Sequence, residues 1–238
     1  MKKENANGLT GAGLFIAIGL VALGWFIYAS ARYVKSRDRV VNVKGLAERE
    51  VKADIAIWPI TFKQASNDLG ALYTDMEDKQ KMLINFLEKS GFAKDEITAG
   101  QFVTNDRATD TYSTQNVKFR YISKNTVTVY SNKVELVREA MNNIGELGKK
   151  GIAIVPPDYE NRTEFLFTKL NEIKPEMVEE ATAKAREVAN KFARDSESTL
   201  GKLKSARQGQ FSIFNRDSNT PHIKKVRVVT TMEYYLVD

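Results

Sequence analysis

Cysteine is absent from this chain of 238 residues, and histidine occurs once, at His222. Without cysteine the chain can form no disulfide, no thiolate metal site and no cysteine nucleophile. A Ser-His-Asp triad could use only His222, and no nucleophile-elbow pattern accompanies it. His222 follows Pro221 in a polar stretch, which predicts a histidine that faces solvent in a loop.

Sequence signatures of common cofactor and metal sites are also missing. The chain has no phosphate-binding glycine loop with its lysine, no dinucleotide fingerprint and no histidine-rich metal spacing. Asp106 and Asp110 form the best acidic pair, but a hard cation needs several more positioned oxygens, so we interpret the pair as turn chemistry. We expect no catalytic residue, no cofactor and no metal, and we do not expect an enzyme.

Charge is mixed along the chain rather than gathered into one sign. The 36 lysines and arginines are interleaved with 30 acidic residues, and no basic stripe runs beside the strand aromatics. This pattern argues against nucleic acid as a partner. The local exception is a basic cluster that follows an apolar segment and could contact lipid phosphates: Arg32, Lys35, Arg37 and Arg39.

The apolar segment covers residues 9–29 and contains no charged residue. As a helix it would be about 31 Å long, which matches the hydrocarbon thickness of a bilayer. Aromatic and basic side chains at its C-terminal end are typical of the headgroup level. The predicted membrane-interface residues are Trp25, Tyr28, Arg32, Tyr33, Lys35 and Arg37. The predicted segments are a cytoplasmic N-terminus (1–8), a transmembrane signal-anchor helix (9–31), a basic linker (32–39) and one folded domain (40–238).

A cleaved signal peptide is the alternative interpretation. Lys2 and Lys3 resemble a basic leader, and cleavage near Ala31 would fit the small residues there. The apolar run is longer than that of a typical signal peptide, so we favour a retained anchor. Small residues on one face of the helix permit close packing of anchors in lipid: Gly13, Ala17 and Gly24.

Residues beyond position 39 predict an α+β fold, in which helices pack on a mainly antiparallel sheet. Alternating runs around Val41–Val43 and Ile55–Ile57 predict two paired strands, with Gly45 at a turn or bulge. Further strands are expected at 97–104, 117–123 and 126–130, after Thr163, and at 226–237.

Three amphipathic helices are expected between these strands. The first spans 69–87 and ends before Gly91, and the second spans 134–147. The third has Pro175 in its first turn. Its predicted apolar stripe is Val178, Ala181, Ala185, Val188 and Phe192.

Several motifs of the folded region match those of a known family. The segment VNVKGLAEREVKADIAI keeps Val43, Gly45 and Asp54, although Ala47 and Ala53 stand where glycine and proline are usual. The segments LEKSGFAKDEITAGQF and ATAKAREVANKFARDSESTLGKL supply a helix stop with a D-x-I-T feature and an alanine-rich helix. The chain therefore resembles the SIMPL-domain family over residues 40–238.

The resemblance implies an exported domain. No set of catalytic residues belongs to the shared motifs. The resemblance also implies ring-like or channel-like homo-oligomers and a role in envelope or oxidative stress. A positive-inside charge count alone would place the domain in the cytoplasm, but a large domain can be translocated despite basic flanks. We therefore expect a single-pass inner-membrane protein with an extracytoplasmic domain, and membrane lipid and further copies of the chain as partners. The alternatives are a ligand sensor or enzyme that uses the loop at 105–116, and an adaptor for another envelope protein.

Overall fold

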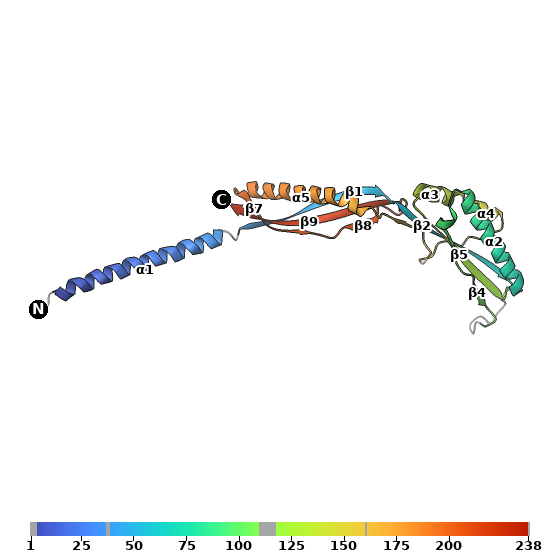
Figure 1. Cartoon of the computed structure of the whole chain (residues 1–238), viewed down its shortest axis with the longest axis horizontal. Coiled ribbons are helices and arrows are strands. Elements are labelled where there is room, and N and C mark those ends of the chain that lie inside the picture. Colours follow the sequence, from blue (N-terminus) through green and yellow to red (C-terminus); the bar gives the residue numbers. More distant parts are fainter. Residues whose placement is uncertain (1–3, 37–38, 110–117, 160, 238) are drawn as a thin grey trace. The chain divides into compact units, whose positions relative to one another are not determined.

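The computed structural model describes residues 4–36, 39–109, 118–159 and 161–237 (Figure 1). It confirms a mixed α+β fold with antiparallel sheets and packed helices. The chain forms two compact units, and helix α1 (Glu4–Ser36) belongs to the first. Unit 1 consists of Met1–Glu48, Lys174–Ser212 and Arg227–Asp238, and unit 2 consists of Arg49–Ile173 and Ile213–Val226.

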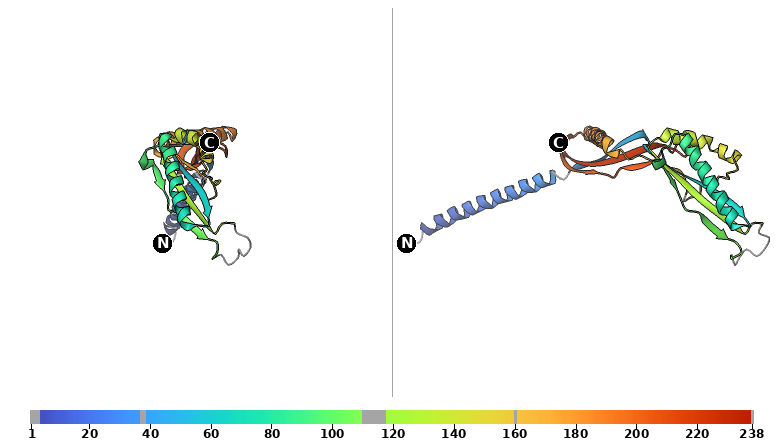
Figure 2. Two further views of the ribbon diagram at one scale, coloured as in Figure 1. Left: turned by 90° about the vertical axis from the view of Figure 1, so that its right-hand side faces the viewer. Right: turned by 45° about the vertical axis from the view of Figure 1, so that its right-hand side comes forward.

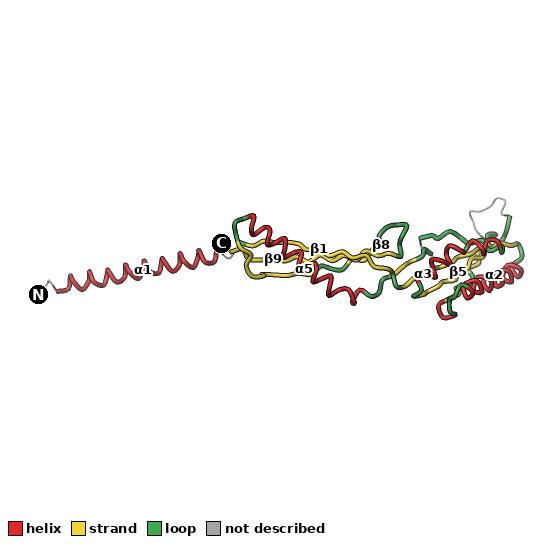
Figure 3. The backbone as a smooth tube through the Cα atoms, turned by 90° about the horizontal axis from the view of Figure 1, so that it is seen from above, coloured by secondary structure: helices red, strands yellow, loops and turns green. Residues whose placement is uncertain are grey.

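Unit 1 is built on strands β1 (Val40–Lys52), β9 (Ile223–Val237) and β7 (Thr199–Gln208), in that order. Helix α5 (Leu170–Asp195) lies over one face of this sheet (Figure 3). Its buried face repeats every four residues, which is the spacing of one helical stripe. The buried residues of α5 are Met177, Ala181, Ala185, Ala189 and Ala193. Of these, Ala185 and Ala189 pack with Val43, Met232 and Tyr234 of the sheet.

The predicted stripe of α5 is only partly right. Ala181 and Ala185 are buried, but Phe192 is 55% exposed. The helix also begins at Leu170, so Pro175 lies inside it rather than in its first turn. Small alanines face the sheet because the helix backbone approaches it closely, which leaves the bulky residues on the flanks.

The predicted pairing of β1 with β2 (Ile55–Ser66) is wrong, because the two strands belong to different sheets. Gly45 lies inside β1 and marks no turn. A Cβ at Gly45 would overlap the carbonyl oxygen of Ala181. The glycine is therefore required by close helix packing, which neighbouring residues in the sequence do not reveal.

Unit 2 contains the sheet β3-β5-β2-β6, with β4 paired to β5. Strands β2 and β5 pair antiparallel from Ala56↔Ser131 to Ser66↔Tyr121, and β2 buries alternate residues. Figure 2 shows α2 running beside this sheet. The bounds are α2 Leu69–Lys89, η1 Lys94–Glu96, β3 Ile97–Ala99, β4 Val103–Asp106, β5 Tyr121–Ser131, α3 Val134–Asn143, α4 Gly145–Lys149, β6 Glu164–Leu166 and β8 Ser212–Asn215.

The helices of unit 2 largely follow the predicted periodicity. As predicted, the helix ends before Gly91, which has φ +101°. Asp68 caps the start of α2 by accepting a hydrogen bond of 2.9 Å from the Ala71 amide. The predicted helix over 134–147 is divided at Ile144 into α3 and α4. The core joins the helices to the sheet through Trp58, Ile60, Phe62, Leu72, Met76, Leu83, Leu87, Val127, Val129, Val137 and Leu147.

Candidate functional site

Helix α1 contains one stretch, Phe15–Arg32, that is long and apolar enough to cross a membrane. None of this stretch is buried within the protein, so it is not a core helix. Its length and composition fit either a membrane anchor or a signal sequence.

The predicted membrane-interface residues lie near the end of α1. Trp25 and Tyr28 are exposed, and the Arg32 guanidinium lies 5.5 Å from the centre of the Tyr28 ring. An aromatic ring and a cation are thus brought together one helical turn apart. Tyr33 and Lys35 belong to α1, but their side chains lie outside the described part of the chain, as does Arg37 as a whole.

The small residues proposed for anchor packing are accessible. A Cβ at Gly13 or Gly24 would meet no heavy atom within 4 Å. Ala17 lines a shallow apolar depression on the helix together with Val21 and Trp25. Another helix could therefore approach this face closely.

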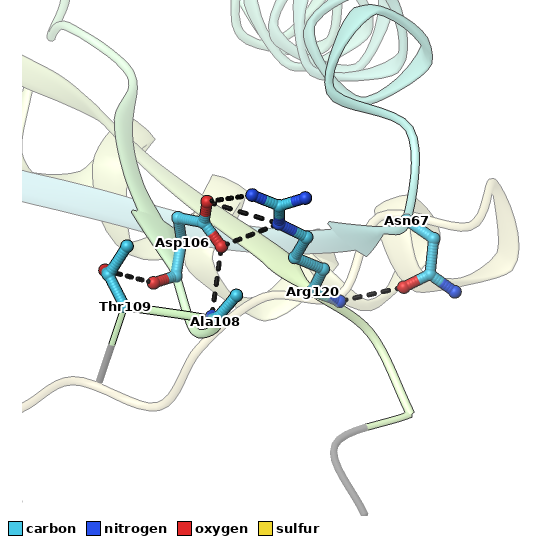
Figure 4. A network of polar contacts seen from close by, with 5 residues as sticks. All are labelled: Asn67, Asp106, Ala108, Thr109 and Arg120. Atoms are coloured by element: carbon cyan, nitrogen blue, oxygen red, sulfur yellow. Dashed lines mark hydrogen bonds and ion pairs between the residues drawn. The ribbon is translucent and has the colours of Figure 1, made fainter. Parts of the chain in front are cut away.

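A polar network holds the base of the loop at 105–116 (Figure 4). The Asp106 carboxylate accepts hydrogen bonds from Arg120 Nε at 3.0 Å and Nη2 at 2.8 Å, and from the Ala108 amide at 3.0 Å. The hydrogen bonds from Arg120 lower the pKa of Asp106. Asn67 accepts a hydrogen bond of 2.8 Å from the Arg120 amide.

Asp106 therefore acts in a turn, as its position in the sequence suggests. Asp110, its predicted companion, lies outside the described residues. Across the ranges that the structure describes, no three acidic or histidine side chains are grouped to hold a metal ion.

His222 is buried, and the prediction that it faces solvent is wrong. Only 8% of the residue is exposed, its ring meets the Phe165 ring edge-on at 6.0 Å, and its carbonyl oxygen accepts a hydrogen bond of 2.8 Å from the Ala53 amide. Burial lowers the pKa of His222, and the positive charge of Arg138 lowers it further. Sequence neighbours could not reveal this burial, because Ala53 and Phe165 reach His222 from distant parts of the chain.

His222 lines a pocket of about 350 Å³ at the N-terminus of α3. The pocket is rich in cationic and hydrogen-bond-donating groups. Its lining residues are Lys52, Ala53, Asn132, Lys133, Val134, Glu135, Leu136 and His222.

Lys133 connects this pocket to the partly buried carboxylate of Glu96. Lys133 Nζ lies 2.8 Å from Glu96 Oε2, and the Ser131 hydroxyl donates a hydrogen bond of 2.6 Å to Glu96 Oε1. Partial burial alone would raise the pKa of Glu96, but these contacts and the Ala93 amide outweigh it and lower the pKa to about 2. Glu96 thus stays ionised and holds Lys133 beside the pocket.

A second, larger groove of about 570 Å³ lies between α2 and the pair α3 and α4. Charged and amide side chains surround its apolar floor of Phe86, Leu136 and Ala140. Sequence periodicity did not predict this groove, because it forms where two separate helices meet.

Comparison with protein families assigns the chain to a known family. The SIMPL family, described as a protein of unknown function (DUF541), matches residues 41–232. The chain belongs to the SIMPL family. Comparison with curated proteins finds no match.

The SIMPL motifs of this chain have structural roles. Gly45 has no side chain, which allows α5 to pack closely against β1. Ala47 is fully buried in the same strand. The Asp54 carboxylate accepts two hydrogen bonds of 2.8 Å from Thr168, one from its amide and one from its hydroxyl. These contacts organise backbone segments and form no reactive constellation.

Proposed function

We propose that this SIMPL protein is a membrane-anchored protein of the cell envelope whose folded region assembles with further copies of the chain. In this proposal it is neither an enzyme nor a nucleic-acid-binding protein. The single observation that carries the proposal is the wholly unburied apolar helix at Phe15–Arg32, which precedes the folded SIMPL region. The proposed location is the inner membrane, with the folded region outside the cytoplasm.

Retention of α1 can be tested directly on the mature chain. A retained anchor predicts an intact mass that includes α1, and a protein that stays in the membrane fraction after an alkaline carbonate wash. A soluble mature chain that begins near Ala31 would show cleavage instead and overturn the anchor. Replacing Val21 and Leu23 with arginine should release the protein from membranes, because each charge is costly in the middle of a span.

Self-assembly is supported by the uncovered edge of unit 1. Strand β7 is at the edge of its sheet, and residues 202–208 are all exposed. Leu203 pairs with the buried Tyr234 and shares its side of the sheet, yet Leu203 is 45% exposed. Free backbone groups and exposed apolar side chains at an edge are suited to pairing with another chain.

Mass measurement of the detergent-solubilised full chain tests the assembly. An oligomer is expected for the native chain, and Leu203→Asp should weaken it because the aspartate places a charge at the proposed contact. Tyr159→Asp is the matched control, since Tyr159 is exposed in unit 2. A strict monomer across working concentrations would overturn the proposed assembly.

Ligand sensing is the second candidate function. The observation that favours it is the His222 pocket rather than the loop at 105–116, where Asp106 is already held by Arg120. An adaptor function and a role in envelope or oxidative stress remain predictions. Crosslinking in native membranes would identify a heterologous partner, and a deletion strain challenged with peroxide or detergent would reveal a stress phenotype.

A further inference from the structure

We propose that the N-terminus of α3, together with Lys52, Lys133 and His222, binds a small oxyanion of the phosphate or carboxylate type. The site lies wholly within unit 2. It does not depend on the membrane anchor or on self-assembly.

The first turn of α3 offers backbone donors that have no partner. Lys133 is the N-cap residue and provides no side-chain cap. The amides of Val134, Glu135 and Leu136 donate to no acceptor within the described residues. Such amides, combined with the positive end of the helix dipole, favour an anion.

His222 supplies an independent indication of a ligand. The residue is more than nine-tenths buried, yet its ring nitrogens form no hydrogen bond with any described residue. His222 is among the residues that line the pocket, so a ligand bound there would lie beside this side chain. A buried polar group without a partner is unfavourable, and a bound acceptor would satisfy it.

The charges that surround the ring are mainly positive. The ammonium group of Lys133 is paired with the ionised Glu96, so Lys133 adds little net charge. Lys52 is largely exposed and has only a 3.9 Å contact with Glu135. Burial is the largest cause of the lowered pKa of His222, and nearby cations lower it further. The charged residues that act on the ring are Arg138, Arg216 and Lys52, which lower its pKa, and Glu135, which raises it.

Glu135 is the one carboxylate in the lining, and it is already engaged. Its Oε2 lies 2.5 Å from Arg138 Nη1. The remaining polar lining is dominated by donors: amides, ammonium groups, the Asn132 side chain and the imidazole. An acceptor-only ligand matches this set, and about 350 Å³ is enough space for a small oxyanion.

Because His222 is the only histidine, its imidazole Cε1–H group gives a single NMR signal. The full chain, purified in detergent through a tag without histidine and labelled with ¹³C-histidine, is titrated with inorganic phosphate at constant ionic strength. We expect a saturable shift of this signal and a higher pKa of His222 with phosphate bound, because the anion stabilises the imidazolium. Acetate in a parallel titration distinguishes carboxylate from phosphate binding.

Two variants with opposite charge effects separate binding from a structural role. Lys52→Gln should weaken binding about fivefold and Glu135→Gln should strengthen it, since a charge a few ångströms away contributes roughly this factor. Lys89→Gln, in the groove between α2 and α3, is the control and should leave binding unchanged. A far-UV circular dichroism spectrum and a thermal unfolding midpoint like those of the native chain show that each variant is folded.

The proposal is overturned if neither phosphate nor acetate shifts the histidine signal beyond the effect of chloride at equal ionic strength. It is also overturned if the shift saturates with the same affinity in Lys52→Gln and Glu135→Gln. A monomeric or cleaved protein that still binds phosphate would reject the proposed anchored assembly while supporting this site.

Discussion

Gly45 of β1 lies directly against the backbone of Ala181 in α5. A Cβ at Gly45 would overlap the Ala181 carbonyl oxygen and lie 2.6 Å from the Ala185 amide nitrogen. The helix can approach the strand this closely because both surfaces are made of small residues. The contact therefore sets the spacing between helix and sheet in unit 1.

Gly45→Ala should destabilise unit 1 by about 1–3 kcal/mol, because the added methyl group must displace backbone rather than a flexible side chain. Chemical denaturation monitored by circular dichroism measures the change. Gly148→Ala is the control, since Gly148 lies in α4 with no heavy atom near its added Cβ. Equal stability of Gly45→Ala and the native chain would show that α5 is not tightly packed on β1.

Asp68→Ala should destabilise α2 by about 1 kcal/mol, because the Ala71 amide loses its side-chain acceptor. Urea denaturation of the full chain gives the difference in unfolding free energy. Asp78→Ala removes an exposed acid from the middle of the same helix and should have a smaller effect. Similar losses in the two variants would argue against the capping role of Asp68.

Glu96 should make unit 2 sensitive to acid. Its folded pKa of about 2 lies below the ordinary value of 4.5, so ionised Glu96 stabilises the fold above pH 4.5. That stabilisation is lost as the pH falls from 4.5 towards 2. Glu96→Gln should cost about 1–2 kcal/mol at neutral pH and flatten the unfolding free energy over this range. Glu77→Gln, an exposed change on α2, should retain the native pH profile.

His222 should produce a separate pH dependence at higher pH. Because its folded pKa is lower than the ordinary 6.5, the unfolded chain binds the proton more readily. Stability should therefore be complete above pH 6.5 and decrease as the pH falls through 6.5 towards the folded pKa. His222→Gln should remove this decrease in thermal unfolding scans. If the stability of His222→Gln depended on pH as that of the native chain does, another group would be responsible for the decrease.

Local periodicity was sufficient to predict much of unit 2. The apolar spacing of α2 and the left-handed Gly91 beyond its end depend on neighbouring residues, and the structure contains both. The cap at Asp68 was not predicted, although it too depends on neighbouring residues. The α+β class and the long C-terminal strand β9 were also predicted. Strands β7 and β8 were not predicted, because exposed polar edge strands have weak apolar alternation.

Long-range packing explains the wrong predictions. A strand pattern does not specify its partner, so β1 and β2 were expected to pair although they enter different sheets. Phe192 was expected on the buried face of α5 because its side chain is large and apolar. The buried face consists mainly of alanines instead, because the helix lies close to β1. The candidate anion pocket was also missed, because it gathers Lys52, Lys133 and His222 from distant parts of the chain.

The sequence by itself determined the apolar helix α1, the absence of cysteine chemistry and the helix of unit 2 that is capped by its own neighbours. These features depend on composition or on residues a few positions apart, where the chain geometry is fixed. Only the tertiary structure decided the pairing of the strands, the role of Gly45 and the burial of His222. Each of these requires residues far apart in the chain to meet, and such contacts depend on packing that no local pattern specifies.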